Sequence, residues 1–329
     1  MLKKISFIFL LLLTIFSLNV ISCEDHGISL NKNRLNDIIN RYVANDYYPF
    51  LYVRMQDKDG RLMYEHSAVN NEIHPGLEVD GKTLIRIWSM SKIVTISVAM
   101  DLIEDGILYL NEPVTRYIPE FKNLMVAQSK DGRTLSTFGG GSAFGEPIDS
   151  RIELACPLEL VKNDSTMLVR HLMDHTAGFY YANTKIECLD DPIIDEDPVM
   201  AQNSDSLINI LSRLPLIHHP GERSHYGLST TVLGLVAERA TGLTLEQLVS
   251  QRITEPFGFS GMRFKLEERD RLIPPMTYKN EHFRIPKKGE MDILGKNVPK
   301  YDKGQKLYFG GAGLLSTSEA YAKYLEIWL

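Results

Sequence analysis

Ser89 and Lys92 stand three residues apart near the start of the apolar segment RIWSMSKIVTISVAM, residues 86–100. The segment is apolar on nearly every side, which predicts a buried helix from Ser89 to about Asp105 that is closed by Gly106. In the first turn of that helix, the serine lies at the positive end of the helix dipole and the lysine falls on the same face. Burial favours the neutral amine, which can then accept the proton of the serine hydroxyl. The pair is therefore a candidate nucleophile and proton acceptor.

The same two residues also have a structural interpretation. A serine at the start of a helix is a common N-cap, and a lysine can carry its ammonium to the surface along an apolar stem. A Ser-x-x-Lys spacing is also expected roughly once by chance in a chain of this size. The local pattern alone leaves the catalytic and the structural interpretation open.

A second candidate site consists of His171, Asp174 and His175. Two histidines at i and i+4 on a helix can bind zinc, and an acid beside the second resembles inverted zincin motifs. The aspartate replaces the longer glutamate that activates water in those enzymes, and the sequence shows no third ligand. A zinc hydrolase at His171 and His175 is therefore one alternative, and capping or packing histidines are the other. His218 and His219 are expected in a solvated loop.

Four segments resemble the serine β-lactamase and penicillin-binding-protein superfamily. IWSMSKIVTISVAMDLIEDGILYLNEPVTRYIPEF is similar to its nucleophile region, in which Ser-x-x-Lys opens the central buried helix. The segment HLMDHTAGF resembles the conserved helix and turn of the superfamily. The stretch around its catalytic tyrosine is similar to PGERSHYGLSTTVLGLVAERATGLTLEQLVSQRITEPFGF. The segment FGGAGLLSTSEAYAKYL resembles the strand and helix before its third motif. These segments follow the order of the family and cover most of the chain from about residue 50 to 329.

The resemblance implies a role for each of three residues. Ser89 would be the acylated nucleophile, Lys92 its proton partner, and Tyr226 the base that activates first the serine and then water. A tyrosine has a reference pKa of about 10, so it can act as a base at neutral pH only if nearby positive charge lowers that pKa. Lys92 is the natural source of this charge. The structural alternative for Tyr226 is a core tyrosine with a bonded hydroxyl.

The tyrosine motif departs from the pattern of class C β-lactamases and many peptidases. Their motif is Tyr-x-Asn, and the asparagine contacts the substrate amide, whereas this chain has Tyr226-Gly227-Leu228. A leucine cannot make that hydrogen bond, and Tyr-x-Leu is closer to family VIII carboxylesterases, which share the fold. The motif therefore slightly favours an ester over a β-lactam or a peptide that ends in D-Ala.

The third motif of the superfamily, Lys-Thr-Gly or a variant, is missing at its expected place after the final helix. Lys287-Lys288-Gly289 precedes GGAGLLST and is in the wrong order. The final helix also reaches Trp328 and Leu329 without a Gly, Pro or basic stop signal. We therefore expect the sequence to be a fragment whose C-terminal strands are absent.

The elements that must position these residues suggest an α+β fold. A first helix is expected before Tyr48, followed by a hairpin of FLYVRMQ and RLMYEHS around Gly60. Helices are expected up to Gly242 and from the Thr244/Gln247 capping box, then loops with short strands over residues 265–306. A strand at residues 307–309 and a helix opened by a Ser316/Glu319 capping box end the chain. We predict a β-lactamase/transpeptidase-like fold, in which an antiparallel sheet built from both chain ends encloses a helical region at roughly residues 107–260.

The N-terminus has the layout of a secretory signal peptide, with two lysines and then an apolar run from Ile5 to Leu18. Val20-Ile21-Ser22-Cys23 resembles the lipobox of bacterial lipoproteins. We predict a signal peptide at 1–22, lipidation of Cys23, and a single domain at 23–329 that faces the periplasm or the cell exterior. Loss of the signal changes the formal charge from −6 to −8, which disfavours nucleic acid as a partner. Cys156 and Cys188 either pair in an oxidising compartment or remain buried thiols.

These observations together predict an exported serine hydrolase that forms an acyl-enzyme on Ser89 without metal or organic cofactor. Its substrate would be an ester, a β-lactam or a D-Ala peptide, with an ester slightly favoured. The main alternative is a catalytically inactive, lipid-anchored binding protein of the same fold. The sequence gives no oligomeric state.

Overall fold

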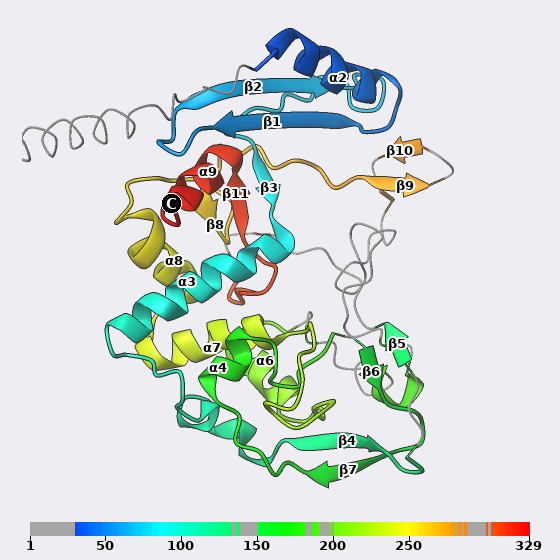
Figure 1. The fold of residues 1–329 in the computed structure, drawn as a ribbon, viewed down its shortest axis with the longest axis vertical. Helices are drawn as coiled ribbons and strands as arrows, with labels where there is room; N and C mark the ends of the chain where they lie inside the picture. Colours follow the sequence, from blue (N-terminus) through cyan, green and yellow to red (C-terminus); the bar gives the residue numbers. More distant parts are fainter. Residues whose placement is uncertain are drawn as a thin grey trace, which may run out of the picture.

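The computed structural model describes residues 30–132, 136–138, 151–181, 184, 186–190, 198, 201–279, 282–284, 286–287, 301 and 304–329. Cys23, Gly289 and most of the glycine-rich segment at 138–147 lie outside these ranges. Within them, no helix combines the length and apolar character needed to cross a membrane. The chain forms an upper part of strands and a lower part rich in helices, and the long helix α3 lies between them (Figure 1).

The upper part begins with helix α2 (Lys32–Ala44) and the antiparallel pair β1 (Phe50–Gln56) and β2 (Leu62–Val69). Ile39 and Val43 are buried on the side of α2 that packs against β2. The turn of the hairpin contains Gly60 with a φ of 76°, a conformation that glycine adopts without steric cost. The predicted first helix and hairpin are therefore confirmed.

A three-stranded antiparallel sheet joins residues from both ends of the chain. Its order is β3 (Leu84–Arg86), β11 (Leu315–Thr317) and β8 (Met262–Arg263), with Ser316 opposite Ile85. Strands β9 (Thr277–Lys279) and β10 (His282–Arg284) form a separate antiparallel pair. The pairing of β3 with β11 confirms the predicted sheet from both chain ends.

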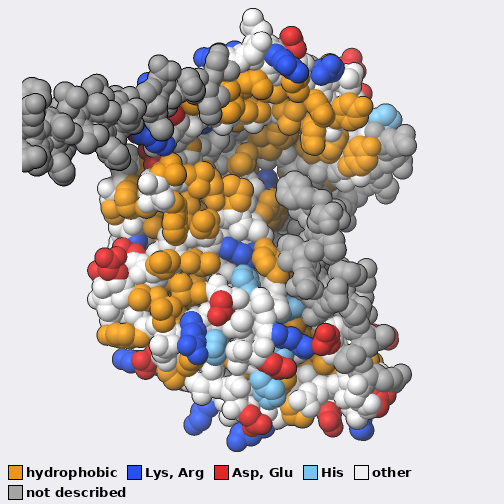
Figure 2. Space-filling model, viewed as in Figure 1, with side chains coloured by type: hydrophobic (Ala, Val, Ile, Leu, Met, Phe, Trp, Pro, Cys, Tyr) orange, Lys and Arg blue, Asp and Glu red, His pale blue; other side chains and the backbone are white. Residues whose placement is uncertain are grey.

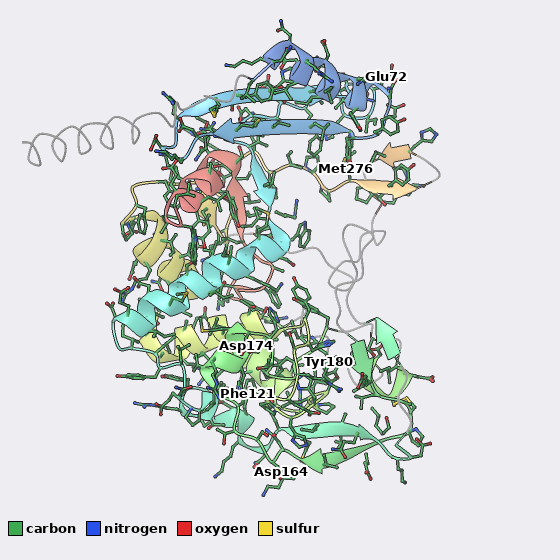
Figure 3. The ribbon with its side chains drawn as sticks, in the orientation of Figure 1. Glu72, Phe121, Asp164, Asp174, Tyr180 and Met276 are labelled. Atoms are coloured by element: carbon green, nitrogen blue, oxygen red, sulfur yellow. A yellow bond between two sulfur atoms is a disulfide. The ribbon has the colours of Figure 1, made fainter. Side chains whose placement is uncertain are left out.

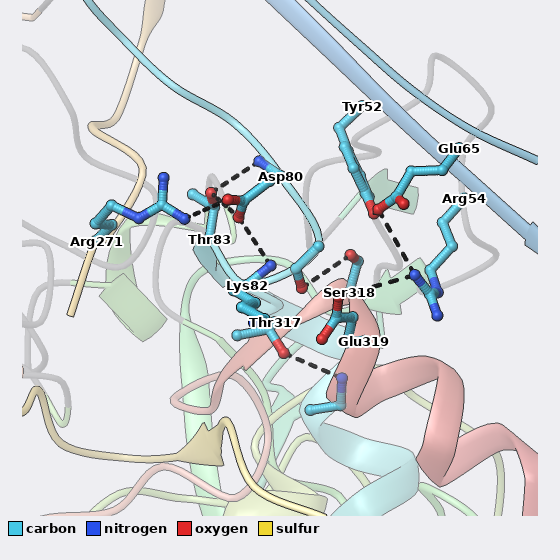
Figure 4. A network of polar contacts seen from close by, with 12 residues as sticks. Tyr52, Arg54, Glu65, Asp80, Lys82, Thr83, Arg271, Thr317, Ser318 and Glu319 are labelled. Atoms are coloured by element: carbon cyan, nitrogen blue, oxygen red, sulfur yellow. Dashed lines mark hydrogen bonds and ion pairs between the residues drawn. The ribbon is translucent and has the colours of Figure 1, made fainter. Parts of the chain in front are cut away.

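Polar contacts connect the hairpin to the final helix, α9 (Ser318–Glu326) (Figure 4). Arg54 on β1 lies 3.9 Å from the carboxylate of Glu319, and Nε2 of Gln56 donates to the backbone carbonyl of Ala322 at 3.3 Å. The Ser318 hydroxyl donates to the carbonyl of Gly81, just before β3. These contacts hold the hairpin against the sheet that leads into Ser89.

Helix α3 (Ser91–Glu104) forms the centre of the core. Val94, Val98 and Leu102 recur at four-residue spacing and are fully buried, and α3 packs against α7 (Ser229–Thr241). Two expectations need correction. Ser89 lies in the 3₁₀ turn η1 (Trp88–Met90) before α3, because the chain turns sharply there. Helix α3 is also not buried on every side, since Met100 is 50% exposed.

Helices α4 (Val169–Met173), α6 (Ser204–Leu211) and α7 lie below α3, whereas the short helix α8 (Leu245–Val249) lies above it (Figure 1). The 3₁₀ turns η2 (Val114–Arg116) and η3 (Pro119–Asn123) follow α3 along the chain, and the π-helical turn η5 (Ser250–Thr254) directly follows α8. Gly242 ends α7 with a φ of 73°, and the Thr244/Gln247 capping box opens α8, as predicted.

Two antiparallel strand pairs also lie within residues 107–260. They are β4 (Met125–Ser129) with β7 (Leu158–Lys162), and β5 (Ser136–Phe138) with β6 (Arg151–Glu153). Figure 3 shows Phe121 and Tyr180 among the side chains of this lower part, with Asp164 just beyond β7. A disulfide joins Cys156 to Cys188, so the interpretation of these residues as two separate buried thiols is wrong.

Two local predictions near the C-terminus are wrong. Residues 307–309 form no strand, because Leu307, Tyr308 and Phe309 are buried in the core and a turn follows at once, with two backbone bonds to the carbonyl of Phe309. The cap of α9 is Thr317, whose side chain accepts from the Ala320 amide, because Ser316 is the central residue of β11.

Apolar side chains also reach the surface of the upper part. Figure 2 shows them over the hairpin and over the helices beneath it. They include Met55 and Leu62 of the hairpin, and Leu325 and Trp328 at the end of α9.

Candidate active site

The structure brings Ser89, Lys92 and Tyr226 together. The hydroxyl of Tyr226 donates to Oγ of Ser89 at 2.6 Å, and Nζ of Lys92 donates to the same oxygen at 3.3 Å. The Lys92 ammonium also lies 4.5 Å from the centre of the Tyr226 ring. Ser89 itself is exposed, so its hydroxyl is accessible from outside and contacts two groups that can move a proton.

Lys92 is buried, with only 7% of its surface exposed. Its ammonium donates to the carbonyl of Gly311 at 2.7 Å and to the hydroxyl of Tyr181 at 3.3 Å, in addition to Ser89. Burial lowers the pKa of Lys92, and the nearby Tyr226 offsets part of that shift. The site therefore makes the neutral amine more accessible than in water, as the sequence predicted from the apolar surroundings.

A glycine loop holds the carbonyl that binds Lys92. Hydrogen bonds attach residues 310–314 to both central helices: Thr95 of α3 donates to the carbonyl of Gly310, and Thr231 of α7 accepts from the amide of Gly311. A Cβ on Gly310 would lie 2.9 Å from Cγ2 of Thr95, and a Cβ on Gly311 would lie 2.7 Å from Oγ1 of Thr231. Only glycine permits this close approach, which places the Gly311 carbonyl over the start of α3.

The turn that presents Ser89 is strained. Trp88 precedes the serine with a φ of 44°, in the left-handed region that a bulky residue rarely adopts. Strain of this kind costs on the order of 1–3 kcal/mol and is concentrated at functional sites. It directs the peptide ahead of Ser89 away from the helical path of α3.

Tyr226 reaches Ser89 because its own segment passes very close to residues 179–181. A Cβ on Gly227 would lie 2.1 Å from the carbonyl oxygen of Phe179 and 2.8 Å from Cα of Tyr180. This contact places Tyr181 next to the site, with its ring centre 6.0 Å from that of Tyr226. Burial raises the pKa of Tyr181, so its hydroxyl stays protonated.

The two histidines of the possible zinc site do not share a helical face. Helix α4 ends at Met173, and His175 follows it with a φ of 61°. The ring of His171 packs at Gly221 and accepts from the Leu168 amide at 3.2 Å, whereas the ring of His175 stacks on Tyr226. The described residues contain no group of three or more His, Cys, Asp or Glu side chains that could hold a metal. The alternative of two zinc ligands on one helical face is therefore wrong.

Two more sequence expectations are clarified by burial. Leu228 is 4% exposed and belongs to the main core, so the third position of the tyrosine motif offers no side chain to a substrate. His218 is 2% exposed, so its placement in a solvated loop is wrong. Its ring nitrogen Nδ1 instead bonds to the carbonyl of His219.

Sequence reasoning missed Tyr181, His175 and Gly311 as residues of the site. Tyr181 carries one signal in the sequence, because it lies two residues after the end of the segment HLMDHTAGF. The sequence presents His175 as a metal ligand or as a capping or packing histidine, and the role of the Gly311 carbonyl depends on a contact across 219 residues.

Comparison with known families decides the relationship of this chain. The family model described as Beta-lactamase matches residues 57–329. The chain belongs to the Beta-lactamase family. Its fold is similar to that of the simvastatin synthase LovD of Aspergillus terreus, which superposes with a TM-score of 0.65 at 22% identity, over 91% of this chain and 68% of that one.

Curated relatives of this Beta-lactamase family member include transferases and esterases. Monacolin J acid methylbutanoyltransferase of Aspergillus terreus is 29% identical over 77% of this chain and 54% of its own length. Esterase EstB of Burkholderia gladioli is 26% identical over 66% of this chain and 48% of its own length. The chain therefore spans about half the length of these two relatives, and it belongs to a family of serine hydrolases and acyltransferases.

Proposed function

We propose that this protein transfers acyl groups through an ester of Ser89. The observation that supports this most directly is the pair of contacts on Oγ of Ser89, from the Tyr226 hydroxyl at 2.6 Å and from Lys92 Nζ at 3.3 Å. A nucleophile in contact with two proton-transfer groups, in a turn just before a core helix, is an arrangement suited to acyl transfer.

The first half of the reaction forms the acyl-enzyme. The neutral amine of Lys92 takes the phenolic proton of Tyr226, and the resulting phenolate takes the proton of Ser89 as Oγ attacks the substrate carbonyl carbon. The tetrahedral intermediate then expels the leaving alkoxide, which recovers the proton from Tyr226. The new bond joins Oγ to the acyl carbon, and the bond between that carbon and the leaving oxygen breaks.

The second half releases the acyl group. Water or an acceptor alcohol donates its proton to the Tyr226 phenolate and attacks the acyl carbon. The intermediate expels Oγ of Ser89, which takes that proton back. Hydrolysis and transfer therefore differ only in the nucleophile, and relatives named as esterases and as acyltransferases fit the same scheme.

An ester is the substrate class that the site favours. Leu228 stands where class C enzymes carry an asparagine, and its burial in the core leaves no side-chain acceptor for an amide N–H at that position. A site without that acceptor leaves the N–H of a bound amide unpaired, whereas an ester has no N–H to pair. β-Lactams and D-Ala peptides are the competing substrates.

The test uses the full-length protein with a fluorophosphonate probe, followed by mass spectrometry of the tryptic peptide at 87–92. We expect one adduct on Ser89, none in Ser89→Ala, and an adduct retained in Ser91→Ala. Ser91 is the matched control, since it is fully buried and its Oγ accepts from the Leu314 amide. Hydrolysis of nitrophenyl butanoate but not of a chromogenic cephalosporin would identify an esterase. An unmodified Ser89 would favour the inactive binding protein.

We also propose that the protein is exported and anchored to the membrane through a lipid on Cys23. The Cys156–Cys188 disulfide supports this location, because such bonds persist in oxidising compartments. Cells fed a radiolabelled fatty acid should label the wild-type chain and not Cys23→Ser. Equal labelling of both chains would contradict the proposal.

A further inference from the structure

His175 lies against the proposed base. Its ring centre is 5.2 Å from that of Tyr226, and the two planes differ by 23°, so the rings are stacked. Its backbone carbonyl also accepts from the amide of His225, the residue immediately before Tyr226, at 2.8 Å. One residue therefore holds Tyr226 both through its side chain and through the neighbouring backbone.

His175 is itself fixed from two sides. Nε2 bonds with Oγ1 of Thr230, a fully buried residue of α7, at 3.3 Å. In the turn that contains His175, the carboxylate of Asp174 accepts from the amide of Thr176 at 3.0 Å and from the Thr176 hydroxyl at 2.6 Å. This turn after α4 sets the direction in which the ring leaves the backbone.

The residue carries costs that packing alone does not explain. Its φ of 61° lies in the left-handed region, which few residues other than glycine adopt. Nδ1 is buried and has no hydrogen-bond partner among the described residues. Burial, followed by the charge of Lys92, lowers the pKa of His175 to about 4, so the ring is neutral at physiological pH.

A neutral His175 ring beside Tyr226 is compatible with proton transfer from Tyr226 to Lys92. A charged imidazolium beside Lys92 would oppose the transfer of a proton to the lysine, because like charges in a buried site raise the energy of the ionised pair. A flat, uncharged ring holds the phenol while leaving its oxygen free to contact Ser89. Two buried contacts of this kind restrict the ring to a narrow range of positions, which acyl transfer requires.

We propose that His175 is a positioning residue of the acyl-transfer site, which holds the ring of Tyr226 by stacking so that the phenol oxygen stays within reach of Ser89. This inference rests on the proposed function. It assigns His175 a role through Tyr226 and no contact with the substrate.

The test compares His175→Asn and His175→Phe in the full-length protein. Asparagine tolerates the positive φ and removes the ring, whereas phenylalanine keeps a flat ring and removes both nitrogens. We expect kcat for nitrophenyl butanoate to fall by about 10- to 100-fold in His175→Asn, with KM within about threefold of wild type. His175→Phe should retain at least about a third of the wild-type kcat.

The results separate positioning from stability and from the proposed function. A kcat near wild type in folded His175→Asn would overturn the inference, as would equal losses in both variants that follow a drop in the melting temperature. If His175→Phe does not fold, the rate of probe acylation in His175→Asn decides alone. Failure of the proposed function is distinct, because the wild-type chain would then show no adduct on Ser89.

Discussion

The hydroxyl of Tyr226 lies 2.6 Å from Oγ of Ser89, although 137 residues separate the two in the sequence. Helix α3 follows Ser89 and helix α7 follows Tyr226, and the two helices pack against each other through the main core. The site therefore lies where the starts of two core helices meet, so the packing of these helices fixes the positions of Ser89 and Tyr226.

The tyrosine that serves as base can be identified by two phenylalanine substitutions. Tyr226→Phe should reduce acylation of Ser89 by about 1,000-fold or more, because it removes the only tyrosine hydroxyl in the described structure that bonds to Oγ. Tyr181→Phe should cost less than about tenfold, since the Tyr181 hydroxyl bonds to Lys92 and burial raises its pKa. Probe acylation rates measure both. A larger loss in Tyr181→Phe would reverse the assignment.

Lys92→Met separates activity from stability. Burial lowers the pKa of Lys92 below its ordinary value of 10.5. Below the lowered pKa, the folded chain carries the full cost of a buried ammonium, and stability rises with pH between the lowered pKa and 10.5. Methionine removes that cost. We expect acylation to fall by about 1,000-fold or more, while the urea midpoint at pH 7 stays level or rises and its increase toward pH 10 disappears. A lower midpoint with retained acylation would contradict this role.

The elements that sequence predicts best are those with local signals. The helices α2 and α7 and the β1–β2 hairpin follow from apolar periodicity and from glycines that end or turn the chain, all within a few residues. The spacing of Ser89 and Lys92 in an apolar segment makes them candidates, the order of family segments adds Tyr226, and the structure brings the three together. Their roles remain predictions.

The features that sequence did not indicate depend on contacts between distant segments. Strand β7 has the sequence LELVK and its side chains are mostly exposed, so it is defined by its pairing with β4 and not by burial of an apolar face. Residues 307–309 have a strand-like composition, yet the core and the following turn at Gly310 determine their path. The sequence leaves metal binding open for His175, beside capping or packing, because nothing local shows that α4 ends at Met173.

The substitution Gly227→Ala, next to Tyr226, should lower both the stability of the protein and the acylation of Ser89. The added Cβ would meet the backbone of Phe179 and Tyr180 at 2.1 and 2.8 Å, and backbone cannot move aside as a flexible side chain can. We expect a loss of about 2 kcal/mol or more in unfolding free energy and at least about 100-fold in acylation. Gly234→Ala in α7 is the matched control, because its nearest contact is the end of the Leu245 side chain at 3.0 Å. Equal behaviour of the two variants in urea unfolding would refute the steric argument.

Acid should destabilise the protein through two histidines next to Tyr226. Burial lowers the pKa of His175 and of His225 to about 4, with Lys92 and Asp174 near the first and His218 and Arg223 near the second. Between about pH 6.5 and 4 the unfolded chain binds these protons and the folded chain does not, so stability falls as pH falls. The loss is on the order of 3 kcal/mol for each histidine. Melting temperatures from pH 7.5 to 4 should show this decline, and His225→Leu should reduce it. An unchanged slope in that variant would exclude His225.

Reduction of the Cys156–Cys188 disulfide should destabilise the lower part of the molecule. The bond closes a loop of 32 residues, for which the chain-entropy model gives about 3–4 kcal/mol. Cys188 packs against the small core cluster that contains Tyr180, the neighbour of Tyr181, so the effect should extend to the site. We expect the Cys156→Ser/Cys188→Ser variant to melt several degrees lower, and its acylation of Ser89 to decline at temperatures at which the wild type is still active. Dithiothreitol should reproduce this shift in the wild type and leave the double variant unchanged. A further decrease in the melting temperature of the variant would show that the reductant acts elsewhere.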